Sequence, residues 1–489
     1  RDTPRPFRTR FVRPPVLRPD RSRRDQDGVW TDYYTINEVA RRARILPTLS
    51  TAIWGYNGTS PGPTVKVRRG RRAVFRVINR LPATHPSLGQ ISTTSVHLHG
   101  SASLPQFDGY ASDVTRPQWF KDYRYPNSQA ARTLWYHDHA VHHTAQNAYA
   151  GLYAQYHLHD AAEQALLPQG EFDVPLVIAD ALFTASGQVT LGDDESGLWG
   201  DVILVNGRPW PVMKVKRRIY RFRFLVASIS RSYRFQLGNG DPVTVVATDG
   251  GLMPKAREVS EWRQASAERY ELLIDFRRYR AGQRVVLRNL SNENNRDFAN
   301  TDQVMAFDVT DAPFSKRDHT WNQLPDTLVD SHVMRLREAD ATRTRTLKVE
   351  RDSDIWTING RTWDDVIASD FQLLFADPKL NATEIWEITN DSGSWFHPVH
   401  THLIDFKILS RNGRQPFDFE RGPKDTAYVG EDETVRVIMR FGPHRGRYMV
   451  HCHNLVHEDH DMMVQYAVGW TPGARDPNDP MGTPARRIP

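Results

Sequence analysis

Cysteine is almost absent from this chain of 489 residues: Cys452 is the only one, so no disulfide can form within the chain. Long apolar runs are missing as well. No stretch reaches the roughly 18 consecutive apolar residues of a membrane-spanning helix, and we expect no membrane span. The chain begins at Arg1, with neither an initiator Met nor a signal peptide. We therefore expect a processed chain that has lost its export signal.

A broad basic face is also missing, although the net charge is +6 and the pI is near 9.3. Residues 1–24 contain nine Arg and two Asp, a local charge of +7, so the remaining residues carry −1 (6 − 7). The basicity belongs to an Arg/Pro-rich N-terminal arm, residues 1–31, which we expect to be solvated or laid over the surface, with binding to a polyanion as the alternative. A folded body without a basic face argues against a nucleic-acid partner.

Helical periodicity is scarce, and short alternating stretches separated by Gly, Asn and Pro turns dominate. Examples are residues 65–80, 218–228, 270–276, 434–441 and 462–470. This pattern predicts an all-β chain of sandwiches or barrels of about 120–160 residues each. The predicted divisions are the arm (1–31), a first unit (32–165), a second unit (170–312), a connector (313–345), a third unit (346–475) and a Pro/Gly-rich tail (476–489).

Histidine occurs 19 times but is missing from residues 160–318. The second unit therefore offers no imidazole and no thiol to a metal, and we expect it to act as a spacer or support. The first and third units contain four His-x-His pairs, and strand alternation places both members of a pair on one face. The pairs are His97/His99, His137/His139, His400/His402 and His451/His453.

These eight imidazoles exceed the four ligands of a tetrahedral zinc site. They suit a cluster of several ions between the first and third units. The same alternation turns Cys452 away from His451 and His453, toward a different metal on the opposite face of the strand. His397, His457 and Met462 are nearby partners, and two imidazoles, a thiolate and a thioether are the ligand set of a blue-copper electron-transfer site.

Other histidines fit the pattern less well. His157 and His159 repeat the His-Leu-His motif, but they follow a predicted closing strand, and we expect them not to be ligands. We expect His142 and His143 to lie near the cluster without binding metal, and His460 to be a bystander because Met462 suits the axial position better.

At these residues the chain resembles the multicopper oxidases, from about residue 32 to 468. The motifs are HLHG (97–100), HDH (137–139), HPVHTH (397–402) and HCHNLVHEDHDM (451–462). Their context is similar to bilirubin oxidases and spore-coat-type laccases, through SPGPTVKV (60–67), QFDGY (106–110) and WGDVILVNGRPWP (199–211). The resemblance implies three cupredoxin-like Greek-key β-barrel domains. It also implies four copper ions, one of type 1, one of type 2 and two of type 3.

Carried over by position, the resemblance assigns the copper ligands. Type 1 copper would have His397, Cys452, His457 and Met462. Type 2 copper would have His97 and His400. The type 3 pair would have the remaining six imidazoles: His99, His137, His139, His402, His451 and His453.

The resemblance also implies roles around the metals. Asp108 and Glu458 would relay the protons that O₂ reduction consumes. Trp395 and Phe396 would lie on the substrate side, and Phe396 stands where the family often has a small or polar residue. Electrons would arrive through a solvent-facing edge of His397 or His457 and pass through Cys452.

We therefore expect a secreted or cell-envelope oxidase, monomeric, that couples oxidation of a small organic donor (bilirubin, phenols or aromatic amines) to reduction of O₂ to water. The main alternative is a metallo-oxidase acting on Fe(II) or Cu(I), although the nine Met form no cluster beyond Met462/Met463. A metal-free scaffold, a copper nitrite reductase and a zinc hydrolase are further alternatives, and each leaves part of the ligand set unexplained.

Overall fold

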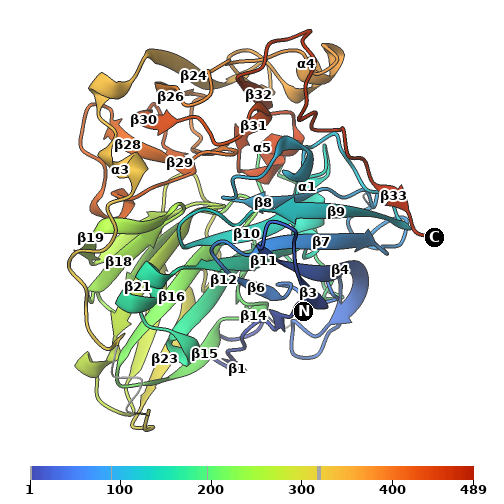
Figure 1. Ribbon diagram of the computed structural model, residues 1–489. Coiled ribbons are helices and arrows are strands. Elements are labelled where there is room, and N and C mark those ends of the chain that lie inside the picture. Colours follow the sequence, from blue (N-terminus) through green and yellow to red (C-terminus); the bar gives the residue numbers. More distant parts are fainter. Residues whose placement is uncertain (1–2, 90, 195, 316–320) are drawn as a thin grey trace.

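The computed structural model describes residues 3–89, 91–194, 196–315 and 321–489 (Figure 1). The chain is 45% strand and 9% helix, which confirms the all-β prediction. No helix in these ranges is long and apolar enough to cross a membrane. The helices are short: α1 (Thr144–Ala150), α2 (Ala161–Leu166), α3 (His332–Arg335), α4 (Trp363–Ala368) and α5 (Leu455–Asp459).

Two sheets form the first unit. One has the order β2 (Val16–Leu17), β6 (Thr64–Arg68), β11 (Tyr153–His159), β10 (Arg132–Asp138) and β8 (Val96–His99). The other has the order β3 (Arg21–Arg24), β4 (Trp30–Ala43), β7 (Arg72–Asn79), β9 (Trp119–Tyr125) and β33 (Arg486–Arg487), with β5 (Thr51–Tyr56) beside β4. Alternation explains β7, where Phe75 and Val77 are buried and Arg76 between them is exposed.

The second unit also has two sheets. The first runs β1 (Thr9–Arg10), β15 (Pro211–Lys216), β23 (Gln303–Thr310), β22 (Arg284–Leu290), β17 (Tyr233–Leu237) and β20 (Glu261–Gln264). The second runs β14 (Arg208–Pro209), β13 (Val202–Val205), β12 (Asp173–Ala181), β16 (Ile219–Val226), β21 (Arg269–Asp275), β18 (Val243–Thr248) and β19 (Gly251–Val259).

Strand β16 differs from its sequence pattern, because alternating Arg and Phe favour one exposed face and yet the whole strand is buried. Its Arg221 and Arg223 lie between the first and second units. Arg223 Nε donates to Asp173 at 2.7 Å and its Nη1 donates to the Thr133 hydroxyl at 3.0 Å. Buried carboxylates thus compensate the buried guanidiniums, as such a position requires.

The third unit completes the series. One sheet runs β25 (Ile355–Ile358), β24 (Arg343–Asp352), β26 (Thr383–Asp391), β30 (Thr434–Arg440) and β28 (Phe406–Arg411). The other runs β29 (Thr426–Val429), β27 (His397–Thr401), β31 (Gly446–Cys452) and β32 (Met463–Val468).

The three units share a connection pattern. An early strand of each pairs in parallel with a later one: β4 with β7, β12 with β16, and β24 with β26. The second member then pairs antiparallel with β9, β21 or β30. Parallel neighbours require a crossover instead of a hairpin, so this is one Greek-key-like topology used three times. The exact unit boundaries remain a prediction; β24 begins at Arg343, inside the predicted connector, and residues 316–320 of that connector lie outside the described residues.

Both ends of the chain join sheets of the body. Strand β1 of the arm extends a sheet of the second unit, and β2 and β3 extend the two sheets of the first unit. The tail returns as β33 to pair with β9. The arm is therefore laid over the surface by backbone hydrogen bonds, one of the two arrangements predicted for it. Figure 1 shows the third unit in orange and red at one end of the molecule, with α5 close to α1 of the first unit.

Candidate metal centre

Two pairs of neighbouring strands supply the histidines. In the first unit, His97 on β8 lies opposite His137 on β10. In the third unit, His400 on β27 lies opposite His451 on β31. The last member of three pairs, namely His139, His402 and His453, follows directly after its strand. All eight imidazoles are at most 1% exposed, and they meet between the first and third units as the sequence predicted.

Hydrogen bonds at the outer edges fix how these rings are protonated. His97 Nδ1 donates to the Asp108 carbonyl at 2.7 Å, and His400 Nδ1 donates to the Asp425 carbonyl at 2.9 Å. Their Nε2 atoms then carry lone pairs, and these face each other at 3.3 Å. Two opposed lone pairs at this distance repel unless a cation lies between them, so the arrangement fits a metal ion.

The same arrangement recurs deeper in the cluster. His451 Nδ1 donates to the Cys452 carbonyl at 3.0 Å, and His402 Nδ1 donates to the Asp108 carboxylate at 2.7 Å. The Nε2 atoms of these two rings are 3.0 Å apart, and His139 Nε2 is also 3.0 Å from His451 Nε2. Three imidazole nitrogens therefore converge on one point.

A second convergent set involves the other three rings. His99 Nδ1 lies 3.4 Å from His137 Nε2, while His137 Nδ1 donates to the Asp138 carbonyl at 2.8 Å. The His453 ring lies 5.2 Å from both of these rings, and its buried Nε2 has no hydrogen-bond partner among the described residues. The eight imidazoles thus form one pair and two groups of three.

Burial also favours the metal-binding form of these side chains. It lowers the pKa of His400 to about 4 and that of His397 to about 3, so both are neutral at pH 7. Neutral imidazole is the form that ligates metals.

Cys452 faces a separate set on the other side of β31. Its Sγ lies 3.3 Å from His397 Nδ1 and 3.7 Å from His457 Nδ1, and these two nitrogens are 3.3 Å apart. The Ser392 hydroxyl donates to Asn390 Oδ1 and accepts from His397 Nε2 at 2.7 Å. His457 Nε2 donates to the Ser196 carbonyl at 2.8 Å. Both Nδ1 lone pairs therefore point at the sulfur and at each other.

A thiolate at this position requires a cation beside it. Burial raises the pKa of Cys452 well above its ordinary value, so an isolated thiolate does not form there. A bound metal deprotonates a coordinating thiol. Met462 is fully buried in the same hydrophobic cluster, and its carbonyl accepts a hydrogen bond from the Cys452 backbone N–H at 3.2 Å.

The solvent-facing edge predicted for His397 or His457 is wrong. Both side chains are 0% exposed, and Ser392 and Ser196 occupy their outer nitrogens. Trp395 is half-buried, and its ring centroid lies 5.9 Å from that of His457. Phe396 is 4% exposed and stacks on Tyr428 at 4.8 Å, so it points away from the sulfur set.

Sequence reasoning missed Trp356 on β25. Its ring stacks on His457 at 3.8 Å and lies edge-on to His397 at 5.3 Å. The Arg351 guanidinium lies over its other side, 5.0 Å from the ring centroid. Trp356 thereby keeps water away from both imidazoles. A Trp in a short strand gives no sign of this contact, because the strand is brought to the site only by tertiary packing.

We predict that Trp356→Leu changes the visible and EPR spectra of the sulfur-set metal and lowers kcat/KM for the reducing donor about tenfold, or ~1.4 kcal/mol. The reason is that water reaches the imidazoles once the stacked ring is gone. Trp356→Phe, which keeps a ring, serves as the matched control and retains the spectra. Unchanged spectra in both variants would show that Trp356 only fills space.

Two carboxylates lie against the cluster, as predicted for Asp108 and Glu458. Asp108 bridges two rings, with its Oδ2 accepting from His402 Nδ1 and its Oδ1 3.4 Å from His97 Nδ1. Burial raises the pKa of Asp108 above its usual range. Glu458 Oε2 lies 3.1 Å from His451 Nδ1 and Oε1 lies 3.4 Å from His139 Nε2, and neither oxygen has a hydrogen-bond partner among the described residues.

A third carboxylate, Asp425, was not predicted. Its Oδ1 accepts from His99 Nε2 at 3.0 Å and from Arg269 Nη1 at 2.9 Å, and all three side chains are at most 1% exposed. Burial alone would raise the pKa of Asp425, but the Arg269 guanidinium together with His99 and His400 outweighs burial and holds that pKa well below its usual range. Arg269 belongs to β21, so the second unit supports the cluster without contributing a histidine.

The remaining histidines make ordinary contacts. His157 Nε2 donates to Gln155 Oε1 at 2.7 Å, and His159 Nδ1 donates to Glu163 at 3.1 Å. His142 is partly exposed beside Asp461, and His460 is exposed. None of these contacts is to one of the eight clustered rings, and that these histidines bind no metal stays a prediction.

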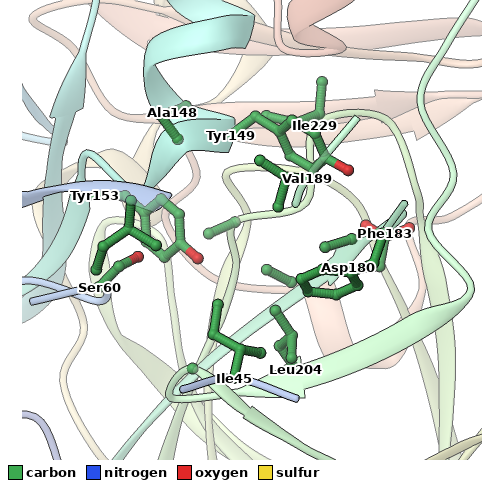
Figure 2. A pocket seen from close by; sticks show the side chains of 16 residues that line it. Ile45, Ser60, Ala148, Tyr149, Tyr153, Asp180, Phe183, Val189, Leu204 and Ile229 are labelled. Carbon is green, nitrogen blue, oxygen red and sulfur yellow. The ribbon is translucent and has the colours of Figure 1, made fainter. Parts of the chain in front are cut away.

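A small cavity between the first and second units lies apart from these sets (Figure 2). Its volume is about 30 Å³, room for one or two water molecules. Asp180 lines it, with one carboxylate oxygen bonded to the Gly200 N–H and to Arg231, and the other without a partner among the described residues. It is too small to admit an organic donor.

The chain is similar in sequence to known proteins. A family model described as multicopper oxidase matches residues 39–163, and a second with the same description matches residues 336–470. The chain is 42% identical to a bilirubin oxidase from Albifimbria verrucaria, over 90% of this chain and 76% of that protein. This chain belongs to the multicopper oxidase family.

Further multicopper oxidases agree over nearly the whole length. A laccase from Bacillus subtilis (strain 168) is 34% identical, over 91% of this chain and 96% of that protein. The crystal structure of a laccase from Pediococcus acidilactici superposes with a TM-score of 0.81 at 29% identity, covering 95% of each chain. The predicted family and cupredoxin-like fold are thereby confirmed, and the protein is an oxidoreductase that uses O₂ and a small-molecule donor.

Proposed function

We propose that this chain is a four-copper oxidase that takes single electrons from an organic donor and reduces O₂ to water. The position of Cys452 supports the proposal. Its sulfur faces His397 and His457, while the residues on either side of it, His451 and His453, belong to the histidine cluster. One residue thus joins two sets of metal donors through two short covalent paths.

The donor atoms fit copper in the predicted distribution. His397, Cys452, His457 and Met462 would hold the type 1 ion, and His97 with His400 the type 2 ion. The type 3 ions would be held by the two groups of three: His139, His402 and His451; His99, His137 and His453. When bound, copper supplies one-electron redox chemistry at the thiolate set and reduction of O₂ at the histidine cluster.

The chain itself holds the protons that O₂ reduction needs. Asp108 contacts the cluster through His402 and His97, and Glu458 contacts it through His451 and His139. Both carboxyl groups are buried and lie within 3.1 Å of an imidazole nitrogen of the cluster, close enough to pass a proton to it. We propose both as proton donors.

We propose that the donor docks in a groove of about 660 Å³ between the second and third units, with Phe396 and Tyr428 in its lining. One peptide bond joins Phe396 to His397, which places the groove beside the sulfur set. Five carboxylates and two guanidiniums line it, a net charge of −3 (2 − 5). Neutral or cationic aromatic donors, such as phenols and aromatic amines, therefore fit better than a dicarboxylate such as bilirubin. The seven charged residues are Arg234, Glu258, Glu261, Arg263, Glu293, Asp418 and Glu431.

We predict that Glu261→Gln with Glu293→Gln raises KM for a cationic aromatic amine about fivefold at low ionic strength, with little change for a neutral phenol, because surface charges act over about 10 Å at 0.1 M salt and farther below it. The difference disappears at ~1 M salt. Asp311→Asn with Asp370→Asn removes two exposed charges outside the groove and serves as the control. Equal KM changes in both double variants would place the donor elsewhere.

Copper content, spectra and oxygen uptake test the proposed function together. We expect four coppers per chain, intense visible absorption from the thiolate–copper bond, and oxygen uptake with phenols and aromatic amines. Copper-loaded protein without that absorption would remove Cys452 from the ligand set. Faster turnover of Fe(II) or Cu(I) than of every organic donor would make the protein a metallo-oxidase.

We also propose that the protein acts as a monomer outside the cytoplasm, secreted or in a bacterial cell envelope, and that the three units are its three domains. Sedimentation at micromolar concentration tests whether the protein is a monomer. Fractionation of the source cells tests whether it lies outside the cytoplasm.

A further inference from the structure

Oxidase chemistry leaves the Arg-rich N-terminal arm unexplained. Its described residues 3–24 contain eight Arg and one Asp, and all eight arginines are exposed residues, although burial lowers the pKa of the Arg13 guanidinium. None of the eight forms an ion pair with a described carboxylate; Arg13 donates to backbone carbonyls and Arg24 to the Gly28 carbonyl. We name this set the arginine strip: Arg5, Arg8, Arg10, Arg13, Arg18, Arg21, Arg23 and Arg24.

The strip is held in place by its backbone. Phe7 and Phe11 donate to carbonyls of residues 210 and 212 at 2.9 Å, and β3 pairs along its length with β4. Arg8 and Arg10 are alternate residues, as are Arg21 and Arg23, so each pair points to one side with a spacing of about 7 Å. The backbone that carries the positive charges is therefore held in place.

Acidic residues beside the strip already have other partners. Asp308 pairs with Arg284 at 2.7 Å, Glu171 pairs with Lys216 at 2.8 Å, and Asp32 pairs with Arg71. The body of the protein thus leaves the strip uncompensated. A strip placed only to strengthen the fold would use these carboxylates, because paired charges stabilise more than unpaired ones.

A groove of about 970 Å³ runs along the start of the strip. Five cationic side chains and one carboxylate line it, a net charge of +4 (5 − 1). Lys214 is exposed there and, like the strip, has no carboxylate partner among the described residues. The six charged residues are Arg8, Arg10, Arg13, Lys214, Arg284 and Asp308.

We propose that the arginine strip and this groove bind an acidic polysaccharide, a chain with repeated carboxylate or sulfate groups. Guanidiniums recognise both groups through paired hydrogen bonds. Single-stranded nucleic acid is less suitable, because no exposed aromatic side chain lies among residues 3–24 to stack on a base. Duplex DNA also carries a regular row of anions, and the experiment below includes it as the competing probe.

The position of the strip suits attachment without loss of activity. In Figure 1 the arm strand β1 lies at the end of the molecule opposite to the third-unit strands β24 and β26. A polymer bound along the arm would therefore leave the third unit facing solution, where small donors arrive.

The test uses copper-loaded, full-length protein and three immobilised probes: polygalacturonate, dextran sulfate and duplex DNA. We expect binding to polygalacturonate or dextran sulfate that weakens as salt rises, and undiminished oxidation of a soluble phenol by the bound enzyme. In the fourfold variant Arg8→Gln, Arg10→Gln, Arg21→Gln and Arg23→Gln, affinity falls at least about tenfold at ~50 mM salt, since ion release drives such binding.

A matched control removes four exposed arginines of the third unit, each without a carboxylate partner among the described residues, and also lowers the net charge from +6 to +2 (6 − 4). Its substitutions are Arg343→Gln, Arg361→Gln, Arg414→Gln and Arg440→Gln. Equal losses of affinity in both variants would show that only the net charge of the protein matters, and would overturn the proposal. So would failure of both polysaccharides to bind, or tighter binding of DNA at equal anion concentration. The affinities for polygalacturonate and dextran sulfate then show whether the strip prefers carboxylate or sulfate groups.

Discussion

Replacing Cys452 by Ser should abolish the intense visible absorption and lower kcat on the order of 10³-fold or more, equivalent to at least ~4 kcal/mol of barrier. A hydroxyl cannot supply the charge-transfer band of a thiolate, and it is a poor ligand for the copper that soft donors select. The variant also interrupts both covalent paths from the sulfur to His451 and His453. Copper per chain should fall by one, measured by metal analysis and EPR.

The fold should survive this change, because Ser differs from Cys by one atom. Burying the hydroxyl costs about 1–3 kcal/mol, which thermal unfolding will report. Met462→Leu is the informative companion variant: it keeps the thiolate, so the blue colour remains, and it removes the thioether, so the reduction potential of the copper should rise. An unchanged potential would remove Met462 from the coordination sphere, and a blue Cys452→Ser protein would overturn the assignment of the sulfur set.

Strand alternation allowed most of this site to be predicted. A period of two residues is a property of every β-strand, so the sequence HCH alone places Cys452 opposite His451 and His453. In the same way, the His-x-His spacing of the other pairs predicts that both imidazoles of a pair lie on one face of the strand. The meeting of His97 with His400 across two units does not follow from alternation, and the family resemblance supplied it.

Other features depend on tertiary packing and leave no local signal. Trp356 reaches His457 because β25 folds over the sulfur set, and Ser196 covers the same imidazole from a loop of the second unit. These contacts explain why the predicted solvent-facing edge was wrong. Sequence patterns report which face of an element is apolar, but they do not report which distant element covers it.

Asp425→Asn should destabilise the copper-free protein by about 3 kcal/mol, the lower end for breaking a buried ion pair, because the buried Arg269 guanidinium loses its nearest carboxylate and keeps only Asp249 at 3.8 Å. It should also weaken copper binding about 10- to 100-fold, since a buried carboxylate that accepts from a ligating imidazole fixes the orientation of that ring. His99 loses its anionic acceptor, while the backbone carbonyl that accepts from His400 remains. Denaturant unfolding measures the first effect, and chelator competition followed by EPR measures the second.

Asp405→Asn is the matched control. Asp405 pairs with Arg132 at 2.8 Å across the first and third units, and its side chain bonds to no imidazole of the cluster among the described residues. Since Asp405 is 18% exposed on its side chain, water screens part of the lost pairing, and the destabilisation should be smaller than for Asp425→Asn. Copper affinity should stay unchanged.

A double variant separates the two roles of Asp425. Combining Asp425→Asn with Arg269→Met removes the cation that has lost its nearest carboxylate, and Asp249 keeps Lys424 as its partner at 3.0 Å, so much of the lost stability should return. The acceptor for His99 Nε2 is still altered, so copper affinity should remain low. If stability and copper affinity recovered together, Asp425 would act only by neutralising Arg269. If stability recovered while copper affinity stayed low, Asp425 would be a residue that positions His99. Arg269, from a unit that contributes no metal ligand, would then hold Asp425 in place.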